Sequence, residues 1–223
     1  MSAVAVALET STRTPSVAVE CDGRVWAREL SSERAHSSDL LPALAELVRE
    51  CGAQPRDVGC VFVGVGPGSY TGLRVGVATA LGLVRANGAS ILALPSTEVT
   101  AYGALEPGAA AAVVLDARSS EVYFALYRRT AEGVECQQAP SVVRAELLAE
   151  RLPLGARVLA DDDAVRAARL DLRPDLVLQR HARPRAGDLL ELGKRALAVR
   201  GPDRPELVAP LYLRAFAAKS RRR

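Results

Sequence analysis

The first thirty residues alternate between apolar and polar positions in the way that short β-strands do. Residues 3–8 form an apolar run, and residues 16–21 alternate with β-branched side chains. Asp22-Gly23 is a strong hairpin signal, so the chain is expected to return after it as a third strand. A polar turn at residues 9–14, rich in hydroxyl groups, joins the first two strands. The pattern predicts a small sheet in this part of the chain.

The next apolar residues recur at helical spacing. Ser37 or Ser38 can cap a helix that runs to about Cys51, and Gly52 is its stop signal. The apolar stripe of this helix consists of Leu40, Leu41, Leu44, Leu47 and Val48. Apolar residues at this spacing form one face, so the segment is predicted to be an amphipathic helix.

A buried type of strand then leads into a long helix. Residues 60–65 are apolar apart from one glycine, a Gly-Pro-Gly break follows, and residues 69–86 are predicted to be helical. Gly72, Gly76 and Ala80 recur every four residues and line one narrow face. The neighbouring apolar stripe consists of Leu73, Val77, Leu81 and Val84. Glycine inside a helix costs about 1 kcal/mol relative to alanine, so close packing must offset it. That packing is either against this chain's own sheet and first helix or against a partner.

The second half of the chain begins at a linker-like boundary around residues 104–108. Beyond it, residues 110–115 and 121–127 are predicted as strands of a new sheet. The remaining predicted elements are helices at residues 141–151, 163–170 and 187–199 and short strands near Val158 and Leu176. Strands and helices alternate in both halves, with a similar opening in each. The predicted fold is therefore α/β with two lobes, residues 1–105 and 106–223.

Composition and charge narrow the class of protein only modestly. The chain has 223 residues, of which 49% are hydrophobic, and a formal net charge of +3. No apolar run approaches the roughly 20 residues that span a bilayer, and the basic region of a signal peptide is missing. A cytoplasmic protein that does not associate with a membrane is therefore expected. The net charge is too small to indicate nucleic-acid binding, and residues 219–223 are interpreted as a solvated basic tail. The four cysteines lack metal-site spacing and are expected to be free thiols.

Most candidate catalytic patterns fail on detail. The segment from Gly66 to Gly72 follows a strand and opens a helix, but it lacks the lysine of a phosphate-binding P-loop. Neither His36 nor His181 has a second histidine at metal-binding spacing. The three aspartates at 161–163 are interpreted as a helix start, where negative charge is favourable.

The best polar constellation is Glu9 with Ser11 and Thr12 in the first turn. Carboxylate and hydroxyl oxygens on a strand–turn–strand can hold a magnesium-bound phosphate. They can equally well satisfy the backbone of the turn itself. Both interpretations stay open on the residues alone.

Six long motifs occur in the order in which the TsaB family has them, over nearly the whole chain. They read ETSTRTPSVAV, RAHSSDLLPAL, VGPGSYTGLRVGVATALGL, LPSTEVTAYGA, LDARSSEVYFA and APLYLRAFAAK. On these motifs the chain resembles TsaB, and the stretches at residues 66–76 and 116–118 are the most specific. The resemblance implies two actin-like, sugar-kinase-like lobes related by duplication. Each would be a mixed sheet with flanking helices, and the second lobe would be smaller and degenerate.

The resemblance also implies a function in tRNA modification. TsaB pairs with its catalytic paralogue TsaD, and with the ATPase TsaE the set transfers a threonylcarbamoyl group to the adenosine beside the anticodon. By this resemblance the chain is a non-catalytic subunit that binds and activates TsaD. It is expected to form a homodimer when TsaD is absent and to meet tRNA only through the complex.

The resemblance also implies what the chain can bind in the way of metals and nucleotides. TsaD holds its metal through an H-x-x-x-H pair, and the matching positions here are Ser96 and Thr100. Hydroxyl groups are poor ligands for zinc or iron, so no metal site is expected and the chain is expected not to be an enzyme. The phosphate hairpins of actin-like kinases correspond to residues 9–14 and 116–121. No cofactor is expected to bind tightly, and ATP or ADP with magnesium is expected at most at or near the partner interface.

Helices of the first lobe are expected to form the partner interface. The residues predicted to lie in it are Leu40, Leu44, Leu47, Gly72, Leu73, Gly76, Val77 and Ala80. Three alternatives remain beside the partner-subunit reading. One is a small actin-like ATP-dependent kinase, with Asp116 as its candidate catalytic aspartate. The others are an M22-type glycoprotease-like peptidase and a homodimeric scaffold outside RNA modification.

Overall fold

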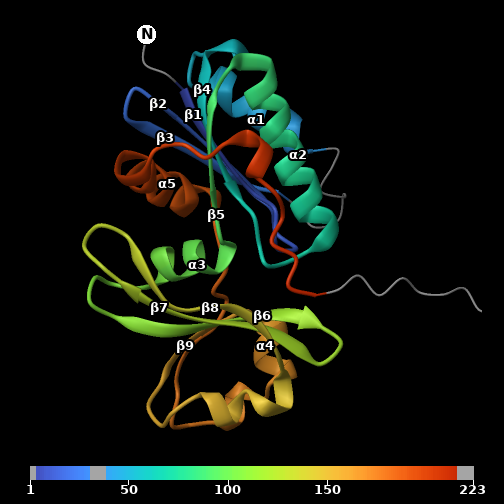
Figure 1. Ribbon diagram of the computed structural model, residues 1–223, viewed down its shortest axis with the longest axis vertical. Helices are drawn as coiled ribbons and strands as arrows, with labels where there is room; N and C mark the ends of the chain where they lie inside the picture. The colour runs from blue at the N-terminus through green and yellow to red at the C-terminus, as the bar shows by residue number, and fades with distance from the viewer. Residues whose placement is uncertain (1–3, 31–38, 215–223) are drawn as a thin grey trace, which may run out of the picture.

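The computed structural model describes residues 4–30 and 39–214 and has two lobes that follow one another along its long axis (Figure 1). Each lobe is built on a five-stranded sheet. The first sheet consists of β1 (Val4–Glu9), β2 (Ser16–Cys21), β3 (Arg24–Glu29), β4 (Val58–Gly64) and β5 (Ser90–Leu94), in the spatial order β3-β2-β1-β4-β5. Strand β1 runs antiparallel to β2 and parallel to β4. The sheet is therefore mixed.

The second sheet repeats this arrangement. It consists of β6 (Ala110–Arg118), β7 (Glu121–Arg129), β8 (Val134–Arg144), β9 (Arg157–Ala160) and β10 (Val177–Gln179), in the order β10-β9-β6-β7-β8. Strand β6 is antiparallel to β7 and parallel to β9, just as β1 relates to β2 and β4. Each lobe is thus a three-stranded antiparallel meander followed by two strands added in parallel to its first strand. The prediction of two similarly built α/β lobes is confirmed.

Helices cover both faces of the first sheet because its strands are apolar on both sides. Val6 and Leu8 pack with α1 (Leu40–Glu50) and α2 (Tyr70–Asn87), which lie side by side over one face. Ala7 points to the opposite face, as expected from the alternation of side chains along a strand. That face is covered by α5 (Ala186–Arg200) (Figure 1).

The long helix α2 has clear signals at both ends. Ser69 is its N-cap, and the Ser69 hydroxyl accepts a hydrogen bond from the Gly72 N–H at 3.3 Å. Gly88 ends the helix in the left-handed conformation at φ 65°, which glycine adopts without strain. The proposed caps of α1, Ser37 and Ser38, lie outside the described residues. Neither α2 nor any other helix of the described part is long and apolar enough to cross a bilayer.

Helix α5 corrects the predicted division of the chain at residue 105. Its sequence position placed it in the second lobe, but its apolar residues pack on the first sheet with Phe62. Gly193 permits this approach, because a Cβ atom there would lie 2.4 Å from the Phe62 ring. The first lobe therefore contains residues from both ends of the chain.

Strand β8 corrects the helix that was predicted at residues 141–151. The strand continues to Arg144 and is followed by short 3₁₀ helices, Ala145–Leu147 and Ala149–Arg151. Most of β8 is exposed or half-buried because it forms an edge of the second sheet. Helix α4 (Asp162–Ala167) is shorter than the helix predicted at residues 163–170.

Two segments join the lobes. Helix α3 (Ser96–Ala104) lies between the sheets, and its Thr97 hydroxyl pairs with the Tyr127 hydroxyl of β7 at 2.9 Å. The segment 203–214, which we call the strap, follows α5 and runs along the first lobe to the junction with the second (Figure 1). In the strap, the Leu211 N–H donates to the Val65 carbonyl of the first lobe at 2.8 Å. Arg214 then forms an ion pair with Glu121 of the second lobe at 2.9 Å. Together they fix the relative position of the two sheets.

Candidate functional site

A cavity of about 590 Å³ lies where the two lobes and the strap meet, and we call it the cleft. Its wall is formed by residues 11–14, 67–71, 115–118, Tyr123, 161–163, 181–183 and 211–214. These segments are turns at the ends of the two sheets, so the cleft forms only when the two lobes come together. A concave site of this size between two lobes is the natural place to look for function.

The first-lobe wall of the cleft is a turn packed directly on a glycine. The Ser69 N–H donates to the Ser11 carbonyl at 2.7 Å, which joins the β1–β2 turn to the start of α2. A Cβ atom on Gly68 would lie 2.3 Å from the same carbonyl. The Gly-Pro-Gly segment is thus required for close approach of two backbones. This supports the structural interpretation of those glycines over a phosphate loop.

Glu9 lies beneath the cleft and does not line it. Its carboxylate accepts a hydrogen bond from the Ser11 N–H at 2.8 Å and another from the Ser96 hydroxyl at 2.9 Å. Burial raises the pKa of Glu9, while the hydrogen bonds from Ser11 and Ser96 lower it. A Cβ atom on Gly64 would lie 1.9 Å from the carboxylate, so β4 leaves room for this side chain. Glu9, proposed from the sequence as a phosphate ligand, instead ties the first turn to α3.

Ser11 and Thr12, the other two sequence candidates, do line the cleft. The Thr12 hydroxyl is used within its own turn, where it accepts from the Thr14 N–H at 3.3 Å. The Ser11 hydroxyl oxygen is buried and has no hydrogen-bond partner among the described residues. The Ser11 side chain nevertheless helps to lower the pKa of the Glu9 carboxyl group, so it also serves the contact of the turn with Glu9.

The second-lobe wall carries the three consecutive aspartates. Asp161 is the N-cap of α4, and its carboxylate accepts from the Ala164 N–H at 2.7 Å and from the Asp116 N–H at 2.9 Å. Burial raises the pKa of Asp161. Interpretation of this acidic run as a helix start is confirmed, because the first of the three carboxylates caps the helix.

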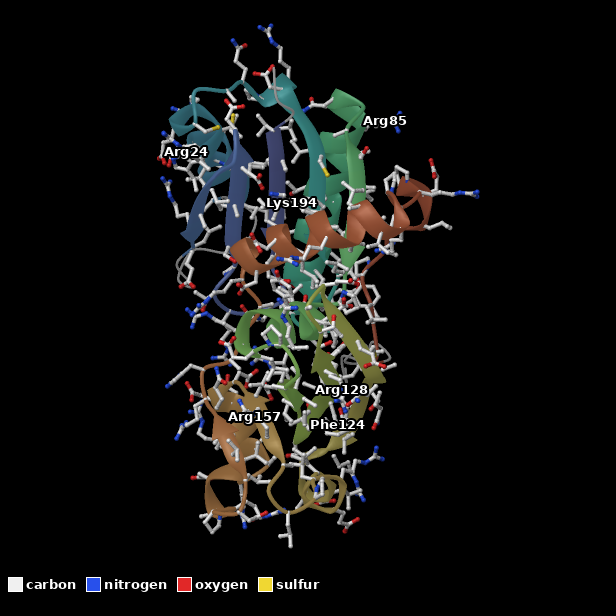
Figure 2. All side chains as sticks on the ribbon, turned by 90° about the vertical axis from the view of Figure 1, so that its left-hand side faces the viewer. Arg24, Arg85, Phe124, Arg128, Arg157 and Lys194 are labelled. Carbon is white, nitrogen blue, oxygen red and sulfur yellow. The ribbon has the colours of Figure 1, made fainter. Side chains whose placement is uncertain are left out.

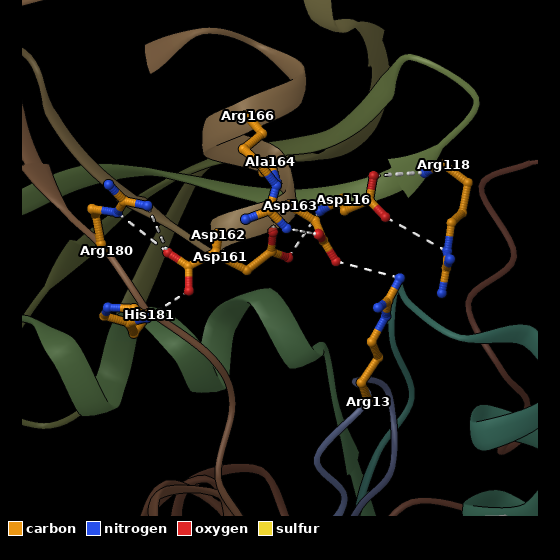
Figure 3. Close-up of polar contacts among 10 residues, drawn as sticks. All are labelled: Arg13, Asp116, Arg118, Asp161, Asp162, Asp163, Ala164, Arg166, Arg180 and His181. Atoms are coloured by element: carbon orange, nitrogen blue, oxygen red, sulfur yellow. Dashed lines mark hydrogen bonds and ion pairs between the residues drawn. The ribbon is translucent and has the colours of Figure 1, made fainter. Parts of the chain in front are cut away.

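Arginines form ion pairs with the remaining carboxylates of the cleft, and the His181 ring also contacts one of them (Figure 3). Arg13 of the first lobe lies 3.5 Å from Asp163 of the second, so this ion pair spans the cleft. Asp162 pairs with Arg180 at 3.2 Å and with the His181 ring at 2.6 Å.

The Asp116 carboxylate, the candidate catalytic aspartate of a kinase, lies 3.6 Å from the Arg118 guanidinium. Among the residues that the structure describes, no three His, Cys, Asp or Glu side chains are grouped to hold a metal ion. The second histidine, His36, lies outside the described residues. The carboxylates of the cleft are thus already committed to ion pairs and caps within the chain.

Ser96 and Thr100, which the resemblance to TsaB sets against the metal ligands of the transferase, are both buried. The Ser96 hydroxyl accepts from the Gly66 N–H at 3.1 Å and donates to Glu9. The Thr100 hydroxyl donates to the Ser96 carbonyl at 2.8 Å. Both hydroxyl groups serve the chain's own hydrogen bonding at the start of α3.

The predicted partner-interface residues lie in the core of this chain, which corrects their assignment. All of Leu40, Leu44, Leu47, Gly72, Leu73, Gly76, Val77 and Ala80 are buried. A Cβ atom on Gly76 would lie 2.2 Å from the Thr10 hydroxyl oxygen, and one on Gly72 would lie 2.1 Å from the Thr10 carbonyl. The Thr10 hydroxyl also donates to the Gly72 carbonyl at 2.8 Å. The glycine face of α2 therefore packs on the β1–β2 turn, and a partner would meet the opposite face.

The outward face of α1 and α2 was missed by the sequence reasoning. Leu41 of α1 is 51% exposed, and Thr71, Arg74, Ala78, Gly82 and Arg85 of α2 are exposed at helical spacing. Space around Gly82 is open, with nothing within 4 Å of a Cβ atom built there. The helical spacing of these positions is visible in the sequence, just as the spacing of Gly72, Gly76 and Ala80 is. Only the tertiary structure decides which stripe faces inward.

A family model described as TsaD, tRNA N6-adenosine threonylcarbamoyltransferase, matches residues 29–158. The tRNA threonylcarbamoyladenosine biosynthesis protein TsaB of Escherichia coli (strain K12) is 30% identical over 220 residues, which cover 94% of this chain and 94% of that protein. The protein of the same description from Haemophilus influenzae is 38% identical over 123 residues, which cover 53% of this chain and 51% of the relative.

Solved structures agree with these sequence matches. The structure described as YeaZ from Pseudomonas aeruginosa superposes with a TM-score of 0.81 at 28% identity, covering 95% of this chain and 100% of that chain. A second structure from P. aeruginosa, described as an uncharacterized protein with similarity to peptidase YEAZ, has a TM-score of 0.81 at 27% identity and covers 96% of this chain. The match therefore includes both lobes.

Proposed function

The chain belongs to the TsaB family of tRNA threonylcarbamoyladenosine biosynthesis proteins, and from this premise we propose that it is the non-catalytic partner subunit of a TsaD-type transferase. In this role it binds and activates the subunit that modifies the adenosine beside the anticodon. TsaE joins the same complex, and tRNA is met through the complex. In the absence of TsaD the chain pairs with a second copy of itself.

The observation that carries the non-catalytic role is the hydrogen bonding at the start of α3. Ser96 and Thr100 stand where the transferase has imidazoles, and both hydroxyl groups are buried and bonded within the chain. A metal ligand needs a free lone pair that points to a shared centre, and hydroxyls are poor ligands for zinc or iron. The chain thus uses these positions to fix Glu9 and the first turn, which favours a structural role for the site.

The outward face of α1 and α2 is the surface that we assign to the partner. It offers Leu41 and the small residues Thr71, Ala78 and Gly82, together with the exposed Arg74 and Arg85. Small residues allow the backbone of a partner helix to approach closely, and the open space at Gly82 leaves room for a side chain of that helix. The same face is available to a second copy of the chain, so TsaD binding and self-association are proposed to be mutually exclusive.

Replacement of Ala78 by arginine tests this surface. The side chain at position 78 points outward from a helix, so the change is expected to leave the fold intact. We expect Ala78→Arg to abolish co-purification with the TsaD-type subunit and to abolish the homodimer. Ala198→Arg is the matched control, since Ala198 is exposed on the outer side of α5. Retained binding by Ala78→Arg with a native circular dichroism spectrum would contradict the assignment.

We further propose that the cleft binds nucleotide only weakly. Its carboxylates are paired with arginines, and the Arg13–Asp163 ion pair spans the space between the lobes. A magnesium–ATP complex would have to compete with these pairs. We therefore propose that the isolated chain does not turn over ATP, and that ATP or ADP with magnesium is held, if at all, where the partner joins. ATP turnover by the isolated chain would favour the actin-like kinase instead.

The role in tRNA modification is tested in cells. Depletion of the protein is expected to lower the threonylcarbamoyladenosine content of total tRNA, measured by mass spectrometry of nucleosides. Expression of the wild-type chain restores it, and expression of Ala78→Arg does not. Unchanged modification after depletion would overturn the proposal and favour the scaffold alternative.

A further inference from the structure

Two cysteines that are thirty positions apart in the sequence come together in the first lobe. Cys21 is the last residue of β2, and Cys51 follows the last residue of α1 as its C-cap. Along β2, Val17 and Val19 point to the face that α1 covers, whereas Glu20 points to the other face and pairs with Lys194 of α5 at 2.6 Å. Alternation along the strand therefore directs Cys21 toward α1.

The C-terminal end of α1 is held over this hairpin by ion pairs. Arg28 of β3 pairs with Glu50 at 2.7 Å and also with Glu46 of the same helix. Both Cys21 and Cys51 pack against the same apolar cluster beneath α1. The nearby Cys51 thiol contributes to the raised pKa of the Cys21 thiol. The Cys51 thiol also donates to the Val48 carbonyl at 3.0 Å, which sets its direction. Strand and helix are thus positioned so that the two sulfur atoms are neighbours.

The accessibility of these thiols distinguishes them from the other cysteines. Cys21 and Cys51 are half-buried, so a small reagent can reach them. Cys60 lies on β4, where burial raises the pKa of its thiol to about 11, and Cys136 is exposed on β8 of the second lobe. Arg24, the first residue of β3, lies at the end of the first lobe that is remote from the second lobe (Figure 2). The pair is therefore separate from the cleft.

We propose that Cys21 and Cys51 form a redox-active pair that closes to an intramolecular disulfide when the protein meets a hydroperoxide. One thiolate attacks the peroxide oxygen and becomes a sulfenic acid, with release of water or an alcohol. The second sulfur attacks the sulfenic sulfur, the S–S bond forms, and a second oxygen leaves as water. Two thiols lose two protons and two electrons, and the O–O bond of the peroxide accepts them.

The reduced state of the pair is the resting state. Desolvation and the Asp22 carboxylate raise the pKa of the Cys21 thiol, which lowers its thiolate fraction and slows oxidation by weak oxidants. A disulfide would link the end of α1 to the β2–β3 hairpin and close the loop from residue 21 to residue 51. Cross-links of this kind stabilise mainly by restricting the unfolded chain. The inference depends only on the thiols and is independent of the proposed function.

The test uses the purified full-length chain and hydrogen peroxide. After brief oxidation, free thiols are blocked with N-ethylmaleimide and the protein is digested without reductant. We expect a peptide pair joined through Cys21 and Cys51, an intact mass lower by two hydrogens, and reversal of both by dithiothreitol. The apparent Tm of the oxidised protein is expected to rise by several degrees over that of the reduced protein.

Variants separate the pair from the other thiols. Cys51→Ser is expected to lose both the linked peptides and the rise in Tm, whereas Cys60→Ser and Cys136→Ser keep them. Circular dichroism of the reduced Cys51→Ser protein shows whether its fold is native. Complete alkylation of Cys21 and Cys51 after peroxide treatment of the wild type would overturn the proposal. So would their independent conversion to sulfinic acids, or a cross-link that runs through Cys136.

Discussion

Glu98 lies in the first turn of α3, between the two lobes, and its removal is expected to change how stability depends on pH. Burial raises the pKa of Glu98 from 4.5 to about 7, and attraction to Arg200 of α5 only partly offsets this. The buried Tyr127 of β7 and Cys136 of β8 also face this carboxylate. No ion pair of Glu98 is present among the described residues. The carboxyl group is therefore desolvated without full compensation.

The magnitude follows from the difference between the two pKa values. Because the folded protein binds the Glu98 proton more tightly than the unfolded chain does, protonation stabilises the folded state. This stability is fully present below the unfolded pKa and is lost as the pH rises through the folded pKa of about 7. Each pKa unit corresponds to about 1.4 kcal/mol, so the total loss is about 3 kcal/mol. Most of it, about 2.5 kcal/mol, falls between roughly pH 5 and pH 8.

Glu98→Gln replaces the carboxyl group by a neutral side chain of the same shape. We expect the variant's advantage over the wild type in free energy of unfolding to be small near pH 5 and about 2.5 kcal/mol larger near pH 8. Urea unfolding, followed by circular dichroism and by the fluorescence of Trp26, measures both proteins at several pH values. Other carboxyl groups with raised pKa values, such as Asp161, are common to both proteins and cancel in the difference.

Glu132→Gln provides the matched control, because Glu132 is an exposed glutamate on the β7–β8 turn. It reports the effect of losing one surface charge. If the difference between wild type and Glu98→Gln is the same near pH 5 and near pH 8, then burial does not raise the pKa of Glu98 and the reasoning is refuted.

Three further substitutions have expected outcomes. Gly76→Leu places side-chain atoms where a Cβ alone would lie 2.2 Å from the hydroxyl of the first turn, so we expect a large fall in Tm, and a native Tm would contradict the packing. Tyr127→Phe leaves the buried Thr97 hydroxyl without its partner and is expected to cost about 1–3 kcal/mol in urea unfolding; an unchanged midpoint argues against that hydrogen bond. Arg13→Ala removes an exposed partner of Asp163 and is expected to change stability by less than about 1 kcal/mol, which a larger loss would disprove.

The stripe of Gly72 and Gly76 illustrates what a sequence pattern can and cannot decide. Spacing of four residues correctly identified a narrow face of α2 that needs close packing. The packing partner is Thr10, more than sixty positions earlier, and nothing in the local pattern indicates it. The sequence left the chain's own sheet and a second protein as equal choices. Burial in the chain's own core decides between them, and the partner surface moves to the opposite face.

Strand β8 and helix α5 were misjudged for two different physical reasons. Residues 134–144 form an edge strand with mostly exposed positions, so period-two alternation is weak there, and part of the strand was predicted to be helical. Residues 187–199 were correctly predicted to be helical, but the prediction of a helix does not say which sheet it covers. The hairpins, by contrast, were predicted well, because Asp22-Gly23 is a local signal with a local cause.

The cleft was only partly accessible to sequence reasoning. Ser11 and Thr12 were identified because a polar turn between apolar strands is visible locally. The ion pair between Arg13 and Asp163 joins residues 150 positions apart and depends on how the lobes meet. Glu9 was proposed as a phosphate ligand because the sequence shows neither its burial nor its hydrogen bond to Ser96, both of which depend on the tertiary structure.

Helix α5 and the strap have a consequence for the synthesis of the chain. The strands of the first sheet lie in the first half of the sequence. The helix that covers Phe62, and Val208 of the first-lobe core, lie near the C-terminus. While the polypeptide emerges from the ribosome, one face of this sheet therefore stays uncovered until some two hundred residues have been translated. A nascent fragment that stops after β5 exposes an apolar surface to chaperones, and only the nearly finished polypeptide can shield it.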